Sequence, residues 1–267
     1  MFQERQQVKR GFLSLPFQAR TLLKCSWVWV QVVFATSFTK PKKSRPVSFS
    51  STKLMQWVAL GAKIPRWAET MSANADYLIK LDGVVGDSDL GLTMADGFKA
   101  AAEAAQASEE TDFGKTAYNA GKAMSNAVPS TMGTLMASGL MAIGKAFKGA
   151  ESIDDANLPD FFQAYFDGVR SRGKAEIGDK TFLDGLAPAI ASLRASVSEG
   201  IPPQRSAADA ASAAHEGFLS TQGMLAKHGR AGGRGEQSRD ILDPGAAVAD
   251  LLLQGFKAFI DMKETDH

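Results

Sequence analysis

Three carboxylates lie within eight positions of the segment LDGVVGDSDLG, which runs from Leu81 to Gly91. They belong to Asp82, Asp87 and Asp89, and the residues between them are glycine, valine and serine. Short oxygen ligands crowded onto a turn suit Mg²⁺ or Ca²⁺ better than a softer metal, and without a cation three anions this close would repel one another. The alternative is a solvated turn whose aspartates cap a following helix. The spacing alone leaves both interpretations open.

Three further polar segments carry glycines and interrupt the hydrophobic pattern. They are STMGTLMASG from Ser130, GDKTFLDGLAPA from Gly178 and GRAGGRGEQSRDILDPGA from Gly229. We expect each at a helix junction, where free backbone N–H groups and glycine-rich loops bind anions. In an up-and-down bundle alternate loops lie at the same end, so these segments can gather around one site. A cation cluster near such N–H groups and basic residues would suit a nucleotide polyphosphate.

The elements that must position these segments are predicted to be helices. From about residue 54 onward, apolar residues recur at helical spacing, and no convincing alternating strand pattern appears. Seven or eight helices joined by short loops indicate an all-α bundle. An aromatic stripe at residues 161, 162, 165 and 166 is typical of a core-facing helix. The predicted helices cover residues 54–81, 92–107, 116–126, 135–147, 158–168, 182–197, 206–226 and 246–262.

The first 53 residues differ from the rest and are predicted to be a basic, irregular tail before a helical domain at 54–267. Residues 1–50 hold nine of the 30 Lys and Arg but one of the 29 Asp and Glu, which leaves a net charge of −7 on 51–267. An acidic body argues against nucleic-acid binding. The apolar run at 27–38 is too short to span a bilayer, and a single cysteine, Cys25, fits a reducing compartment. We therefore expect a cytoplasmic protein, or an organellar one if the tail is a transit peptide; a disordered extension and a start codon set too far upstream are the alternatives.

The four polar segments, in this order, resemble the L subunit of dihydroxyacetone kinase, a nucleotide-binding domain of the DhaL type. The resemblance covers roughly residues 54–262. The first segment matches the family motif LDxxxGDxDxG, and GDKTFLD from Gly178 matches GDKTxxD. GRAGGRGEQS from Gly229 is similar to GRAxxxGERS, and the triplet that begins at Asp243 matches the closing DPG motif. Four matches in order are far more specific than one.

This resemblance implies an eight-helix up-and-down barrel with Mg–ADP or Mg–ATP bound at one end. It implies that Asp82, Asp87 and Asp89 bind the metal ions, which bridge to the β- and γ-phosphates. No catalytic residue is predicted beyond this metal site. The residues predicted to bind the nucleotide are Gly133, Thr134, Ser138, Gly178, Arg230, Asp243, Pro244 and Gly245.

The implied activity is phosphoryl transfer to dihydroxyacetone or a related short ketose, which a separate K-type subunit holds. The nucleotide is either exchangeable ATP or a tightly bound ADP that a phosphotransferase-system phosphocarrier rephosphorylates. The sequence leaves both donors open, and also a homodimer. A different class of function is a nucleotide-loaded regulatory module that interacts with another protein and has no kinase turnover.

Three positions depart from the family pattern. Leu90 stands where many members carry a histidine expected near the phosphates, and Gln237 replaces the arginine of GERS. The second motif, usually GGxSGPL, matches GTLMASG in two registers: one places Gly133 and Thr134 on the glycines, and the other places Ser138 on the serine. Simple helix caps are the alternative interpretation of the segments that begin at Asp179 and Asp243.

Overall fold

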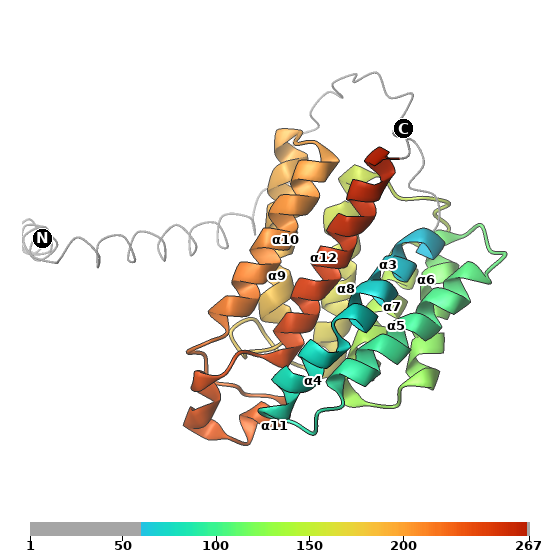
Figure 1. Cartoon of the computed structure of the whole chain (residues 1–267). Helices are drawn as coiled ribbons and strands as arrows, with labels where there is room; N and C mark the ends of the chain where they lie inside the picture. Colours follow the sequence, from blue (N-terminus) through green and yellow to red (C-terminus); the bar gives the residue numbers. More distant parts are fainter. Residues whose placement is uncertain (1–59, 266–267) are drawn as a thin grey trace, which may run out of the picture. The chain divides into compact units, whose positions relative to one another are not determined.

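The computed structural model describes residues 60–265, and within this range every regular element is helical (Figure 1). The prediction of an all-α fold is therefore confirmed. The predicted boundary between residues 53 and 54, and the tail before it, lie outside the described residues. The helices are α3 (Leu60–Ala73), α4 (Ala75–Gly83), α5 (Leu90–Gln106), α6 (Phe113–Ala127), α7 (Thr131–Ala146), α8 (Leu158–Gly173), α9 (Phe182–Glu199), α10 (Pro203–Ser220), α11 (Gly229–Gly232) and α12 (Pro244–Thr265), with 3₁₀ turns η1 (Asp155–Asn157) and η2 (Gly235–Asp240).

The long helices form a closed ring. From α5 to α10 each packs against the next, α10 packs against α12, and α12 packs against α3, which in turn packs against α5. Helices α3 and α4 follow one another with a single break at Asn74. Counted as one rod, they bring the ring to eight rods over residues 60–265, as the resemblance implied. No helix in this range is both long and apolar enough to cross a membrane.

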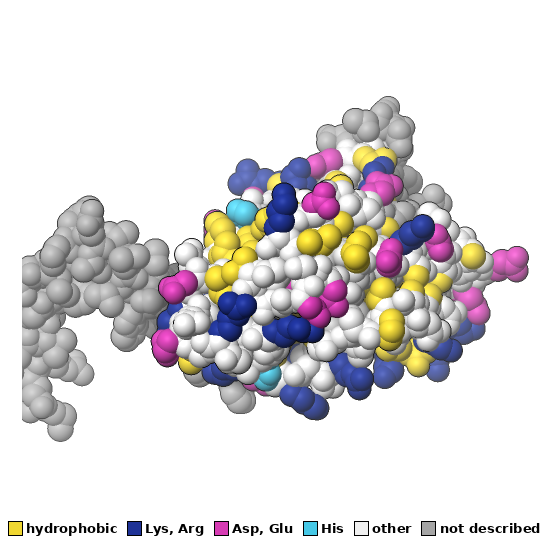
Figure 2. All heavy atoms as spheres, turned by 60° about the horizontal axis from the view of Figure 1, so that its bottom comes forward, with side chains coloured by type: hydrophobic (Ala, Val, Ile, Leu, Met, Phe, Trp, Pro, Cys, Tyr) yellow, Lys and Arg dark blue, Asp and Glu magenta, His cyan; other side chains and the backbone are white. Residues whose placement is uncertain are grey.

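Because successive rods alternate in direction, every second loop lies at the same end of the ring. The loops at residues 84–89, 128–130, 174–181 and 221–243 share the end that carries α11, at the bottom of Figure 1. We call this the α11 end. All four polar segments begin or lie there, so the fold brings together what the sequence separates. Seen from this end, the surface shows both basic and acidic side chains (Figure 2).

Aromatic side chains fill the interior of the ring. Trp67 of α3 lies 6.0 to 6.3 Å, between ring centroids, from Phe98 of α5 and from Phe161 and Tyr165 of α8. All four are buried, and so are Phe162 and Phe166, which confirms the prediction that the stripe on α8 faces the core. Edge-to-face contacts such as those of Trp67 with Phe98 and Tyr165 are a favoured aromatic geometry.

Some helix boundaries differ from the predicted ones, each for a local reason. Helix α7 begins at Thr131 rather than at 135, because Ser130 caps it: the Ser130 hydroxyl accepts a hydrogen bond from the Gly133 amide at 3.0 Å. The first rod runs through Pro65 and breaks instead at Asn74, whose side chain donates to the carbonyl of Thr70. Helix α10 ends at 220 rather than 226.

Helices α7 and α8 cross closely at two glycines. A Cβ added to Gly139 would lie 2.6 Å from the Tyr165 ring, and one added to Gly168 would lie 2.6 Å from the backbone oxygen of Ser138. The Gly139→Ala variant should therefore be less stable by roughly 1–3 kcal/mol, because overpacking outweighs the better helix propensity of alanine. Urea unfolding followed by circular dichroism measures this difference. Gly173→Ala is the control, since its Cβ meets only a flexible leucine at 3.1 Å; equal stability of the two variants would contradict the packing argument.

Candidate metal centre

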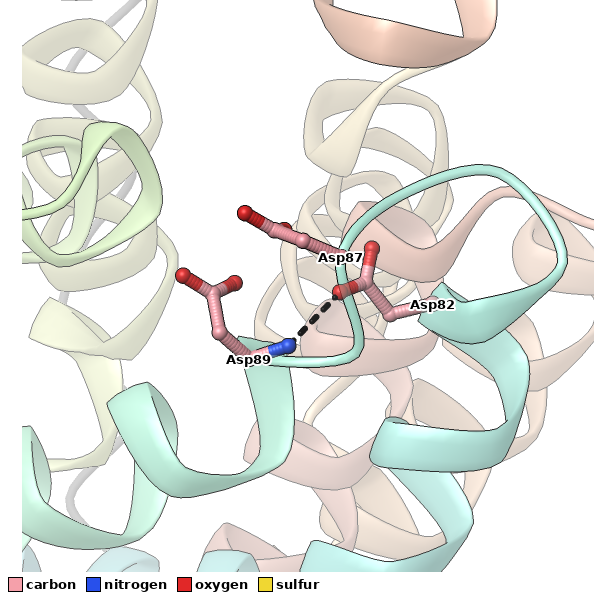
Figure 3. A group of neighbouring side chains, drawn as sticks. All are labelled: Asp82, Asp87 and Asp89. Carbon is pink, nitrogen blue, oxygen red and sulfur yellow. Dashed lines mark hydrogen bonds between the residues drawn. The ribbon is translucent and has the colours of Figure 1, made fainter.

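The three predicted metal ligands lie together at the α11 end. Asp82 is the penultimate residue of α4, Asp87 lies in the following loop, and Asp89 immediately precedes α5. One carboxylate oxygen from each lies within 4.8 Å of the others. Figure 3 shows the side chains of Asp87 and Asp89 pointing toward one another, beside Asp82. This spacing matches the requirement of one ion held by three short oxygen ligands.

The loop between α4 and α5 is shaped around the carboxylate of Asp82. One of its oxygens accepts hydrogen bonds from the amide of Asp89, just before α5, at 3.1 Å and from that of Leu90, the first residue of α5, at 3.4 Å. Gly86 must lack a side chain, because a Cβ there would overlap this carboxylate. Ser88 adopts a positive φ of 64°, which lets the chain turn back toward α5. Helix capping and metal binding, posed as alternatives from the sequence, are therefore compatible in Asp82.

The charges of the triad are only partly balanced by the protein. The pKa of Asp89 is raised, first by burial and then by the negative charges of Asp87 and Asp82. Arg230 forms an ion pair with Asp87. One guanidinium against three carboxylates leaves a surplus of negative charge, which a divalent cation would neutralise.

Arg230 comes from a long loop, residues 221–243, that packs on the triad loop. Val85 is buried together with Ala226 and Ala231, and Ile241 packs against this small cluster. The contact joins segments about 140 residues apart in the sequence, as does the ion pair of Arg230 with Asp87. The structure thus places Arg230 beside the triad. From the sequence, this proximity was expected only through the resemblance to the kinase family.

The second motif lies inside helix α7. Gly133 and Thr134 occupy its first turn, and a side chain at Gly133 would meet the carbonyl of Val128 at 2.5 Å. Ser138 lies one turn further on, and its hydroxyl donates to the carbonyl of Thr134 at 2.7 Å. The start of α7 therefore places Gly133 and Thr134 at the α11 end, while Ser138 is bonded to its own helix.

The remaining predicted binding residues are tied to helix starts. Gly178 has a φ of 92°, and its amide donates to Asp184 of α9 at 2.5 Å. The buried carboxylate of Asp243 accepts from the Ala246 amide at 2.7 Å, and Pro244 is the first residue of α12. The helix-cap interpretation of the DPG triplet is confirmed, with Gly245 in the first turn. Burial raises the pKa of Asp243 to about 7.

The segment before α9 contains buried polar groups whose roles the sequence did not show. Thr181 caps α9 in a reciprocal pair with Asp184, as the cap interpretation predicted. Asp179 and Lys180, by contrast, are buried and point to the 221–243 loop: Asp179 pairs with Lys227 and His228, and Lys180 donates to backbone carbonyls. A lysine between aspartate and threonine carries no sequence signal of burial.

The departures from the family pattern have clear positions. Leu90 is 6% exposed and belongs to the hydrophobic core of the ring, although its amide donates to Asp82. Gln237 is exposed in η2. His215 pairs with Asp250. Among the described residues, the triad is the one cluster that groups three potential metal ligands. His215 and His228 therefore each pair with one carboxylate, that of Asp250 and that of Asp179.

Comparison with known proteins agrees with this architecture. Residues 84–258 match the model of the DAK2 domain, a range that includes Asp87 and Asp89 and begins just after Asp82. The ADP-binding subunit DhaL of the PEP-dependent dihydroxyacetone kinase of Escherichia coli (strain K12) is 33% identical over 208 residues, which cover 78% of this chain and 96% of that subunit.

Longer relatives match over a part of their length. The L-erythrulose 1-kinase of Mycolicibacterium smegmatis is 31% identical over 72% of this chain, which spans 34% of that kinase. The crystal structure of the dihydroxyacetone kinase from C. freundii in complex with AMP-PNP and Mg²⁺ superimposes with a TM-score of 0.59 at 21% identity, over 82% of this chain and 38% of that one. The structural match establishes the shared fold. From the family model and the identity to DhaL over most of both chains, this chain belongs to the DAK2 domain family and is of the DhaL type.

Proposed function

We propose that this protein is the nucleotide-binding subunit of a dihydroxyacetone kinase or of a kinase for a related short ketose. The observation that carries the proposal is the triad of Asp82, Asp87 and Asp89, which faces Arg230 at the end of the ring where the four motif loops meet. The DhaL relatives are named as ADP-binding subunits, and the similar C. freundii kinase was crystallised with AMP-PNP and Mg²⁺.

Different groups at the α11 end would bind the metal ion and the phosphates of a magnesium nucleotide. Mg²⁺ bound by the three carboxylates would neutralise the phosphate charge and orient the phosphoryl group that is transferred. Arg230, which pairs with Asp87, lies where its guanidinium would bind a phosphate oxygen of such a nucleotide, a kind of contact that it can make with two hydrogen bonds. Gly133 and Thr134 lie in the first turn of α7, whose N-terminus would attract the same anion through the helix dipole, although their own amides are bonded to Ser130. Gly178 and the DPG triplet shape the neighbouring loops.

The ketose belongs on a second protein, a K-type subunit. The chain matches the DhaL subunits over 90% or more of their length in E. coli and in one Listeria innocua relative, and those relatives are named as PEP-dependent. This pattern favours a separate subunit that retains ADP and receives its phosphoryl group from a phosphocarrier. Direct use of ATP is the other variant.

We also propose that residues 54–267 are the folding unit and that residues 1–53 are an appendage.

A reconstitution tests the proposal. Calorimetry of the full chain should show ADP binding that requires Mg²⁺ and disappears with a chelator. With the cognate K-type subunit and dihydroxyacetone or another short ketose, a phosphorylated ketose should then form with either ATP or a phosphocarrier. Absence of Mg²⁺-dependent ADP binding would refute the nucleotide site. Binding without product from either donor would favour the regulatory module.

Replacing Arg230 tests the side chain that faces the triad. Arg230→Gln should weaken the binding of Mg–ADP about tenfold or more, because a charge-assisted contact to phosphate is lost. The affinity for Mn²⁺ alone should rise instead, because no guanidinium then competes for Asp87. Calorimetry with each ligand gives both constants. The matched control is Arg205→Gln, which breaks an exposed ion pair on α10; equal effects of the two changes would contradict the role of Arg230.

A further inference from the structure

The loop at residues 221–243 is long and has little structure of its own. It contains one four-residue helix, α11, and one 3₁₀ turn, η2. Its apolar contact with the triad loop is the small cluster of Val85, Ala226, Ala231 and Ile241. Even with Leu242, which packs against the core of the ring, this apolar surface is too small to fix more than twenty residues against their conformational entropy. Polar contacts must hold the loop.

One buried ammonium group supplies the central contacts. Lys180 is 2% exposed, and its Nζ donates to the carbonyls of Thr221 at 2.8 Å, Ser238 at 2.7 Å and Ile241 at 2.5 Å. The carbonyl of Met224 lies 3.4 Å away. These carbonyls come from the start and the end of the loop, so a single side chain joins its two ends. Burial lowers the pKa of Lys180.

The neighbouring residue holds the middle of the same loop. The carboxylate of Asp179 accepts from Lys227 Nζ at 2.5 Å and lies 3.2 Å from His228 Nε2, while its carbonyl accepts from the Lys227 amide at 3.2 Å. These contacts lower the pKa of Asp179 to about 2, the side chain of Lys227 contributing most. Lys227 and His228 immediately precede α11, which carries Arg230.

Lys180 reaches this position through an uncommon backbone conformation. Its φ is 62°, in the left-handed region that non-glycine residues rarely occupy. The turn sends the side chain of Lys180 to the ends of the loop and that of Asp179 to its middle. No described contact joins Lys180 to the aspartates of the triad, so its influence on the triad passes through the loop.

We propose that Lys180 is a positioning residue that fixes the 221–243 loop so that Arg230 faces the carboxylate triad. The inference rests on the proposed function, since Arg230 is there a phosphate ligand. Lys180 itself touches neither metal nor nucleotide. Its ammonium orders the loop before the nucleotide arrives, so that binding does not have to supply the ordering free energy.

Lys180→Met in the full chain tests this role, with Lys257→Met as the matched control because Lys257 makes a partly exposed pair with Asp261 on α12. Calorimetry should show Mg–ADP binding weakened roughly 10- to 100-fold at unchanged stoichiometry, as for other residues that orient a ligand's contacts. Mn²⁺ binding to the triad should be retained or become stronger, as for Arg230→Gln, because Asp82 still holds the triad loop and a displaced Arg230 competes less for Asp87. Backbone amide exchange should rise over residues 221–241 and not in α5.

Two results would overturn the proposal. A Lys180→Met protein whose folded fraction binds Mg–ADP with wild-type affinity, at reduced stoichiometry, would show a role in folding alone. Unchanged amide exchange in the loop would show that Lys180 does not order it. If Lys180→Met does not fold, Asp179→Asn is the second variant: it weakens the ion pair with Lys227 in the 221–243 loop, and wild-type affinity in it would equally count against the proposal. A wild-type chain that binds no Mg–ADP would refute the proposed function, and the exchange measurement would still decide whether Lys180 orders the loop.

Discussion

Asp89→Asn is expected to abolish Mg²⁺-dependent binding of ADP while leaving the fold intact. The change removes one of three oxygen anions that lie within 4.8 Å of one another. Loss of a direct metal ligand should lower the affinity more than about 100-fold, since even residues that only orient such ligands contribute 10- to 100-fold. The carboxylate of Asp89 makes no capping bond to α5, so the helix start should not change.

Stability without metal separates this prediction from simple damage. The pKa of Asp89 is raised by burial and by its acidic neighbours, so removal of its charge relieves repulsion. Urea unfolding without divalent ions should give a free energy equal to the wild-type value within about 0.5 kcal/mol, or higher. Asp96→Asn, an exposed aspartate on the same helix, is the control and should leave ADP binding unchanged. Unaltered ADP affinity of Asp89→Asn in Mg²⁺ titrations would show that the metal assignment is wrong.

Asp243→Asn is expected to remove a large pH dependence of stability. Burial raises the pKa of Asp243 from 3.8 to about 7 in the folded protein. Between these values the folded state holds a proton that the unfolded state has released, so stability falls as the pH rises through this window. At 1.36 kcal/mol per unit, a shift of this size corresponds to a loss on the order of 4 kcal/mol. Asparagine does not titrate and can still cap α12 through its oxygen.

The measurement is the free energy of unfolding of both proteins between about pH 4 and pH 8, without nucleotide. The stability of the variant relative to wild type should increase steadily up to about pH 7 and then level off. The lowered pKa of Asp179, about 2, acts below this window and does not contribute. Asp209→Asn, at a partly exposed position on α10, should show no such trend. A constant difference between Asp243→Asn and wild type would mean that Asp243 ionises normally in the folded state.

The fold was predictable because helical spacing is a local signal. The apolar positions of α8 and α12 repeat with the helical period, and their burial follows directly. Alternation of short loops then decides which segments share an end. The triad was also predictable, since all three aspartates lie in one turn and their proximity needs no long-range contact.

Contacts between distant loops were not predictable from the residues alone. Nothing local distinguishes Lys180 from an exposed lysine, because its burial depends on four carbonyls more than forty residues away. The same is true of Leu90, which the sequence marked as the residue that does not fit a phosphate site. The side chain of Leu90 turns into the core, so hydrophobic packing decides its residue type.

The three aspartates are not equivalent positions for redesign. Asp82 starts helix α5 by accepting from the amides of Asp89 and Leu90, and it lies against a glycine that leaves room for nothing larger. An attempt to change the ion preference of the centre by altering ligand length or charge at residue 82 would therefore also change where a helix of the ring begins. By contrast, no described hydrogen bond joins the side chain of Asp87 or Asp89 to a backbone amide at the start of a helix. Ion preference can be varied at positions 87 and 89, while residue 82 couples the chemistry of the centre to the geometry of the barrel.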